Sequence, residues 1–175
     1  MIVRIQLALL LALLLPIASH AQPAATESPD LVAQKRTVVD IRNVGTAMWT
    51  WYKDEVAPHR SPESHKKAEQ ESQTKEVDFA RVPVISREEL AAVLVPKYIA
   101  WLPEADGWGH PYEFRLNTKD ANAIVVMAVR SAGKDGQLSG SNYSVGSFGP
   151  SEFDQDLAWM DGYFARWPEK KENGR

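Results

Sequence analysis

The longest regular pattern in the chain lies in residues 31–56, which read LVAQKRTVVDIRNVGTAMWTWYKDEV. Apolar side chains recur there at steps of three and four residues, the spacing of one face of an α-helix: Val38, Ile41, Val44, Met48, Trp51 and Tyr52. Just upstream, Ser28 can cap a helix, Pro29 suits its first position and Asp30 favours the positive end of its dipole. Pro58 ends the pattern. We therefore expect one amphipathic helix of about 40 Å, which is longer than a small core can cover alone.

Shorter patterns downstream predict a second helix and three strands. Ser86 and Glu89 have the spacing of a capping box, ahead of a helix predicted over residues 87–95. Alternating or β-branched residues predict strands at 112–116, 124–130 and 162–167. A long helix followed by strands is typical of the α+β class. We expect a single domain over residues 29–168, in which the N-terminal helix packs on a small C-terminal antiparallel sheet.

Three segments are polar and lack a regular pattern. Residues 59–76 hold a single apolar residue and eight charges, so we expect a mobile surface loop. His59 and His65 lie near glutamates in this segment, which is a feature of metal sites as well as of solvated loops. Residues 22–28 are expected to form a linker, and residues 169–175 a disordered tail.

Residues 1–21 have the pattern of an export signal. Arg4 precedes an apolar run of about 14 residues, and Ser19 and Ala21 are small residues of the kind found at a signal-peptide cleavage site. Cleavage after Ala21 would leave 175 − 21 = 154 residues in a periplasmic or secreted protein. The alternative is an uncleaved membrane anchor, although a membrane-spanning helix needs about 20 apolar residues.

Composition excludes several classes of protein. The 175 residues include no cysteine, so disulfides, thiolate zinc sites, iron–sulfur clusters and a thiol nucleophile are excluded. The formal net charge of −3 gives no support for a general nucleic-acid binder. The sequence has neither a Gly-x-Ser-x-Gly elbow nor a phosphate-binding glycine pattern. We expect no catalytic activity, since a hydrolase would need histidines and carboxylates to converge in one pocket.

Several segments resemble one protein family in the order in which they occur. They are RTVVDIRNVGTA (36–47) followed by YKD (52–54), LVPKYI (94–99), DGWGHPY (106–112), SAGKDG (131–136) and DLAW (156–159). Together they resemble the major pseudopilin of type II secretion systems, general secretion pathway protein G, over residues 31–167. The DGWGHPY run is the most specific part of this resemblance.

The N-terminal segment departs from that family. Its members begin with a processing glycine, an aromatic residue and a glutamate a few residues into an uninterrupted apolar helix, and residues 1–21 have neither the glycine nor the glutamate. Pseudopilus fibres are held together by packing of these apolar helices. The resemblance therefore implies a soluble, pseudopilin-like head with a signal peptide in place of the fibre-forming stalk. Such a protein would act through contacts with pseudopilins or other secretion components.

The resemblance also implies a calcium ion (Ca2+) in the loop after the central strand. Calcium takes six to eight oxygen ligands, from carboxylates and carbonyls. The positions implied as ligands are Asp135, Asp154, Gln155 and Asp156, with the carbonyls of Ala132 and Gln137 completing the shell. Without the resemblance, Asp135 would be part of an ordinary turn, and the later acidic residues would be surface acids.

The chain contains six tryptophans, and they suggest a second function. Trp51 and Trp108 are expected in the core, but Trp49 lies about 160° around the helix from Trp51, so both cannot face the sheet equally. An exposed Trp49 would mark a surface for a partner or a glycan, whereas a helix covered on all sides would bury it. The alternative function is a free-standing extracytoplasmic module that binds a glycan or a peptide on the same fold.

Overall fold

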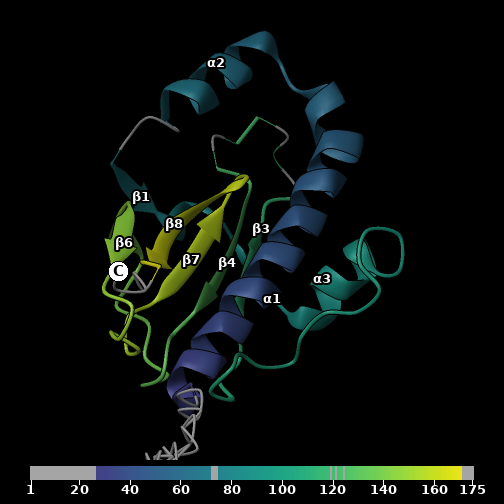
Figure 1. Cartoon of the computed structure of the whole chain (residues 1–175). Coiled ribbons are helices and arrows are strands. Elements are labelled where there is room, and N and C mark those ends of the chain that lie inside the picture. The colour runs from purple at the N-terminus through teal and green to yellow at the C-terminus, as the bar shows by residue number, and fades with distance from the viewer. Residues whose placement is uncertain (1–26, 72–74, 119, 121, 124, 171–175) are drawn as a thin grey trace, which may run out of the picture.

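The computed structural model describes residues 27–71, 75–118, 120, 122, 123 and 125–170. Its fold is of the α+β class, as predicted, with one long helix lying across a sheet of several strands (Figure 1). The predicted signal peptide, most of the linker and most of the C-terminal tail lie outside the described residues. Within the described part of the chain, no helix has both the length and the apolar character needed to cross a membrane.

The two predicted helices are present. The long one is α1 (Pro29–Trp51), which continues as a π-helical turn, η1 (Tyr52–Val56), and a 3₁₀ turn, η2 (Ala57–His59). Ser28 caps it, because its hydroxyl accepts the N–H of Leu31 at 3.2 Å. The second predicted helix is α3 (Arg87–Leu94), and the capping box ahead of it is formed as predicted. A further 3₁₀ turn, η3, covers Phe79–Arg81.

The prediction of a loop over residues 59–76 is wrong where the chain forms α2 (Pro62–Glu71). Its sequence is rich in Glu, Lys, Gln and Ala, which have high helix propensity even where no apolar face is buried. The start of α2 is held by Ser64, which is buried and donates its hydroxyl to Asn122 Oδ1 at 2.8 Å. Arg60 donates to the carbonyl of Ala123 at 2.8 Å. Polar contacts with residues 122–123, rather than an apolar face, therefore position this helix.

Six strands form the main sheet in the order β2-β3-β4-β7-β8-β6. Their bounds are Val84–Ile85 for β2, Glu113–Leu116 for β3, Met127–Ser131 for β4, Gly146–Phe148 for β6, Leu157–Met160 for β7 and Tyr163–Pro168 for β8. A separate antiparallel pair consists of β1 (Glu76–Asp78) and β5 (Asn142–Ser144). The predicted antiparallel arrangement is correct except at one edge, where β6 pairs with β8 in parallel. The exception arises because β6 belongs to the long connection that crosses to the far edge before β7 and β8 are added.

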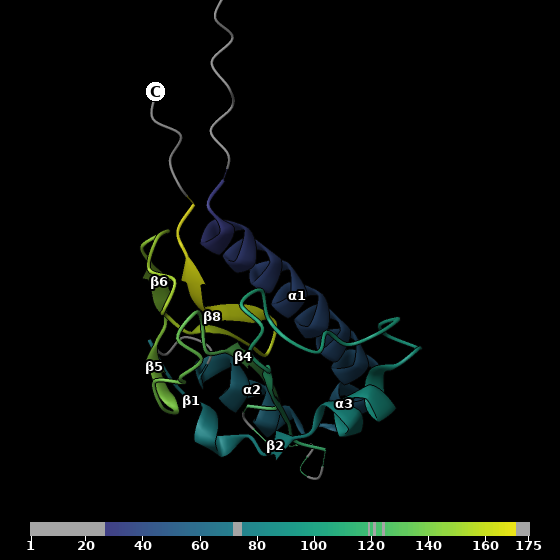
Figure 2. The same ribbon diagram turned by 90° about the horizontal axis from the view of Figure 1, so that it is seen from below.

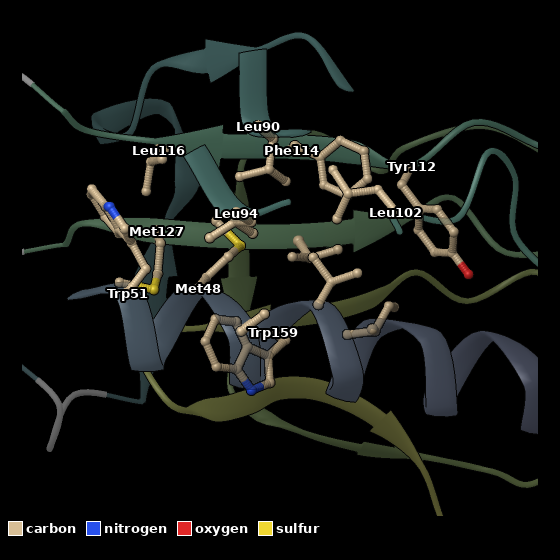
Figure 3. Packing of buried hydrophobic residues seen from close by; sticks show 14 of the residues in the cluster. Met48, Trp51, Leu90, Leu94, Leu102, Tyr112, Phe114, Leu116, Met127 and Trp159 are labelled. Carbon is tan, nitrogen blue, oxygen red and sulfur yellow. The ribbon is translucent and has the colours of Figure 1, made fainter. Parts of the chain in front are cut away.

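Helix α1 packs on one face of this sheet and forms the larger core with it (Figure 3). Ile41, Val44 and Met48 from the helix are almost completely buried against apolar residues of α3 and the sheet. Gly45 is essential for this approach, since a Cβ built there would lie 2.5 Å from the ring of Trp159. The missing side chain at Gly45 thus allows the indole of Trp159 to lie directly against the helix backbone.

The opposite face of the sheet is covered by the β1–β5 pair and η3, which lie on the far side of the sheet from α1 (Figure 2). Phe79 and Val82 are fully buried there, against Ala128 and Ala158 of the sheet. Tyr143 of β5 packs edge-on against Phe79, with 5.4 Å between the ring centroids. Both faces of the central strands are therefore buried.

The exposure of the tryptophan side chains differs in part from the prediction. Trp51 is buried as predicted, and Trp108 is half-buried. Trp49 is half-buried, because it packs against the core and stacks on Tyr52 with 5.1 Å between ring centroids. The exposed tryptophan is Trp101, in the loop after α3, where 65% of the residue remains accessible.

Candidate functional site

The segments that carry the chain's strongest sequence motifs meet around one buried carboxylate, that of Asp106. This residue is 1% exposed. Its Oδ1 accepts the N–H groups of Trp108 and His110 at 3.0 and 2.9 Å. Its Oδ2 accepts the hydroxyl of Ser131, at the end of β4, at 2.6 Å. Asp106 therefore closes the turn of the DGWGHPY run and joins it to the loop that follows β4.

The N-terminal half of α1 lies against the same turn. Gly107 donates its N–H to Thr37 Oγ1 at 2.8 Å, and a Cβ on Gly107 would lie 2.0 Å from the carbonyl oxygen of Ala33. Only a glycine allows the turn to approach the helix backbone so closely. Asp30 accepts the Nε1–H of Trp108 at 3.3 Å and pairs with Lys134 at 2.9 Å. The hydrogen bond from Lys134 lowers the pKa of Asp30.

The side chain of His110 lies between the turn at residues 106–112 and the loop after β4. Its Nε2–H donates to the carbonyl of Lys134 at 3.1 Å. A Cβ on Gly136 would lie 2.8 Å from the ring, so the loop backbone passes directly over the imidazole. Gly136 also has φ of 70°, a conformation that glycine adopts without strain.

A buried chain of polar side chains lies on the other face of the sheet, starting from Arg130 of β4. Arg130 is 2% exposed and donates through Nε and Nη2 to Glu113 Oε1 at 2.9 and 2.6 Å. Arg115 of β3 donates to the same oxygen of Glu113. Burial acts to raise the pKa of Glu113, but the hydrogen bonds from the two arginines outweigh it and hold the pKa below its ordinary value.

The same chain continues from Arg130 to Asp156. Nη1 of Arg130 donates to the hydroxyl of Tyr143 at 3.0 Å, and this hydroxyl donates in turn to Asp156 Oδ2. The N–H of Ser139 donates to the same oxygen at 2.8 Å. Burial raises the pKa of Tyr143, and the hydrogen bond to Asp156 raises it further. The phenol therefore stays protonated and acts as a fixed donor to the carboxylate.

The residues implied as calcium ligands lie in this loop and differ in exposure and in hydrogen-bond partners. Asp135 is exposed, and its Oδ1 accepts the N–H of Gln137. Asp154 is exposed, and Gln155 Oε1 accepts a hydrogen bond from Arg166 at 2.9 Å. Asp156 is 2% exposed, and its Oδ1 has no hydrogen-bond partner. Ala132 is buried and Gln137 is exposed.

Calcium takes six to eight oxygen ligands, and Asp156 Oδ1 is the one buried side-chain oxygen of the implied set that has no hydrogen-bond partner. Within the described residues, no three His, Asp or Glu side chains form a group that could hold a metal. Asp156 Oδ1 is the atom of the implied set that best suits an ion, because an unpaired carboxylate oxygen is costly to bury. Calcium binding at the implied positions stays a prediction.

Sequence reasoning did not find two residues whose side chains help to hold this loop, Arg130 and Tyr143. A signal for Arg130 was present, because it ends the apolar run of residues 124–129. A charged residue in a strand that is buried on both faces needs a partner, and Glu113 pairs directly with Arg130 across the β3–β4 ladder. Tyr143 had no such signal, because it lies in a stretch rich in Ser and Gly.

Comparisons of this chain with family models, with curated proteins and with solved structures give no match.

Proposed function

We propose that this chain is an exported, non-catalytic, pseudopilin-like protein that acts through protein–protein contacts related to type II secretion. The observation that carries this proposal is the junction at Asp106. Three of the segments that resemble general secretion pathway protein G lie against one another there: residues 36–47, 106–112 and 131–136. These segments are far apart in the sequence, and their mutual contacts indicate that they form one structural unit. This unit supports the proposal, because the segments that carry the resemblance belong to one part of the fold.

The outer side of α1 is the surface on which we place the protein partner. Val32 and Val39 are 53% and 49% exposed. They are seven residues apart, so they lie on the same side of the helix, two turns from each other. The buried stripe of α1, which includes Ile41 and Val44, faces the sheet instead. This apolar pair is accessible without any change in the fold.

The contact can be tested with the purified soluble head of a major pseudopilin as the probe. Residues 22–175 would be titrated against it by biolayer interferometry. Changing both Val32 and Val39 to Ser is expected to weaken binding by about tenfold, a loss typical of an interface anchor. Val84→Ser is the matched control, because Val84 is 58% exposed but lies on the sheet-edge strand β2. Equal affinity for the double variant and the control would contradict this surface, and no binding by the parent chain would contradict the function.

Export is a separate part of the proposal with its own measurement. The mass of the protein recovered from the periplasm or the medium should correspond to a chain that begins at Gln22. A mass that includes residues 1–21 would support the membrane-anchored alternative instead.

Trp101 supports a second candidate, a free-standing module that binds a glycan or a peptide. Exposed tryptophans are favoured at binding surfaces because a large apolar ring is accessible there beside a polar N–H group. Trp101 is 65% exposed. An oligosaccharide that binds the parent chain without any secretion component, and fails to bind Trp101→Ala, would favour this candidate. The first candidate predicts that Trp101→Ala leaves binding to pseudopilin heads unchanged.

A further inference from the structure

The loop between β4 and β7 is long, and its sequence does little to order it. Residues 132–156 are rich in Ser and Gly and hold only the short strands β5 and β6. Gly133, Gly136 and Gly140 all adopt positive φ, so the backbone turns sharply at each. Glycines increase the conformational freedom that must be lost when such a segment becomes ordered. Contacts from outside the loop must therefore hold it in place.

Strand pairing supplies part of this hold, because β5 pairs with β1 and β6 pairs with β8. Arg130 supplies a further set of contacts from the central strand. Its guanidinium lies 5.0 Å from the ring centroid of Phe79 and 5.5 Å from that of Tyr143, so apolar rings shield it from water. Nη1 donates to the carbonyl of Gly140 and to the hydroxyl of Tyr143. Gly140 and Tyr143 belong to the loop, whereas Arg130 belongs to the central strand β4. One side chain thus ties the middle of the loop to the sheet.

Tyr143 extends this hold to the end of the loop. Its hydroxyl donates to Asp156, the residue immediately before β7. The N–H of Ser139 donates to the same carboxylate oxygen. The middle and the end of the loop therefore converge on one buried network that begins at Arg130.

The charges of this network balance without an ion. Arg115 and Arg130 contribute two positive charges, and Glu113 and Asp156 contribute two negative charges. Glu113 contacts both arginines directly, and Asp156 is joined to Arg130 through Tyr143. A divalent cation at Asp156 would add two positive charges to a buried group that is already neutral, which is costly in a low-dielectric interior.

We infer that the guanidinium of Arg130 is the cation that orders residues 132–156, in the role that the family resemblance assigns to a calcium ion. This inference does not depend on the proposed function. It concerns how the loop is held, whatever the loop binds.

The test combines calcium dependence with local hydrogen exchange of residues 22–175. The Tm of the parent chain should be the same in millimolar calcium and in excess chelator. Arg130→Met should lower the Tm by about 10 °C and increase amide exchange across residues 132–156. Arg115→Met is the matched control, because Arg115 pairs with the same Glu113 but donates to the carbonyls of Phe79 and Val82 rather than to the loop. Its exchange should increase around residues 79–82 and not in the loop.

Tyr143→Phe keeps the test decisive if Arg130→Met does not fold. It retains the ring packing against Phe79 and removes only the hydroxyl that joins Arg130 to Asp156. Exchange should increase at residues 139–156 in this variant, and calcium should not restore protection. A calcium-dependent rise in the Tm of the parent chain that Asp156→Asn abolishes would overturn the inference. Loop exchange in Arg130→Met no faster than in Arg115→Met, or unchanged loop exchange in Tyr143→Phe, would also overturn it.

Discussion

The carboxylate of Asp161 should make this protein more stable in mild acid, and Asp161→Asn should remove that effect. Asp161 lies in the turn between β7 and β8, with φ of 41°, and accepts the N–H groups of Val126 and Met127 at 3.1 and 3.0 Å. The residue as a whole is half-buried, but its carboxylate lies against the backbone at the start of β4. Burial raises the pKa of Asp161 to about 6, although both hydrogen bonds and the charge of Arg60 act to lower it. The burial of the carboxylate group, and not the average exposure of the whole residue, determines this pKa.

The sign of the effect follows from the two protonation equilibria. The ordinary pKa is 3.8, so between about pH 4 and pH 6 the folded protein binds more protons than the unfolded chain. Stability therefore falls as pH rises through this window. One pKa unit corresponds to about 1.4 kcal/mol, so the loss between about pH 5 and pH 7.5 is at most about 1.4 kcal/mol. For a domain of this size the corresponding shift is about 3–6 °C in Tm.

The assay compares the parent chain with Asp161→Asn by thermal unfolding at several pH values. Asn keeps an acceptor for the backbone N–H groups, tolerates positive φ and carries no charge. Other carboxylates titrate in both proteins, so the difference in Tm between them isolates Asp161. This difference should move in favour of the parent chain by about 3–6 °C when the pH falls from about 7.5 to about 5. A difference that stays constant over this range would refute the reasoning.

Substitutions at three further positions test the packing of the core, the turn at Asp106 and the cap of α3. Gly45→Ala should lower the Tm, because the new Cβ would collide with the ring of Trp159 and overpacking costs about 1–3 kcal/mol. This cost should exceed the gain of about 1 kcal/mol that alanine brings over glycine in a helix. A raised Tm would show that the ring moves aside freely. Asp106→Ala should destabilise the fold by about 3 kcal/mol or more in denaturant titration, because it leaves three donors, one of them fully buried, without their acceptor. Asp106→Asn should cost clearly less. Equal losses for the two Asp106 variants would contradict this explanation. Ser86→Ala should cost about 1 kcal/mol, the value of the hydrogen bond to the N–H of Glu89, and an unchanged midpoint of unfolding would count against it.

The elements that could be predicted from the sequence bury one face or carry a cap, so their residue types recur at a regular spacing. Helix α1 and the capping box of α3 follow directly from residue spacing. Strand β7 was missed because all four of its residues, LAWM, are buried, so apolar and polar residues do not alternate. Strand β2 is only two residues long and gives no pattern at all. Helix α2 was missed for the opposite reason, since it has a helical composition without an apolar face.

The candidate site shows the same division. Asp106, Gly107 and Asp135 stand in turns whose residue types are visible in the sequence. The contacts that hold the loop after β4, however, run between residues 10 to 17 positions apart. The pair of Arg130 and Glu113, on which they rest, depends on the register of β3 against β4. Register is set by the whole sheet, so no local pattern contains this information.

The N-terminus of α1 has its own cap and its own side-chain contacts. A helix that extended upstream would require helical geometry at residue 28, but Ser28 is extended, with φ of −64° and ψ of 146°. Its hydroxyl caps the helix, and Pro29 occupies a position where a missing N–H costs nothing. Side-chain contacts also join the first turn to neighbouring segments, because Asp30 accepts hydrogen bonds from Trp108 and Lys134. These features complete the helix at its own N-terminus, so α1 needs no preceding helical segment to be stable in the fold.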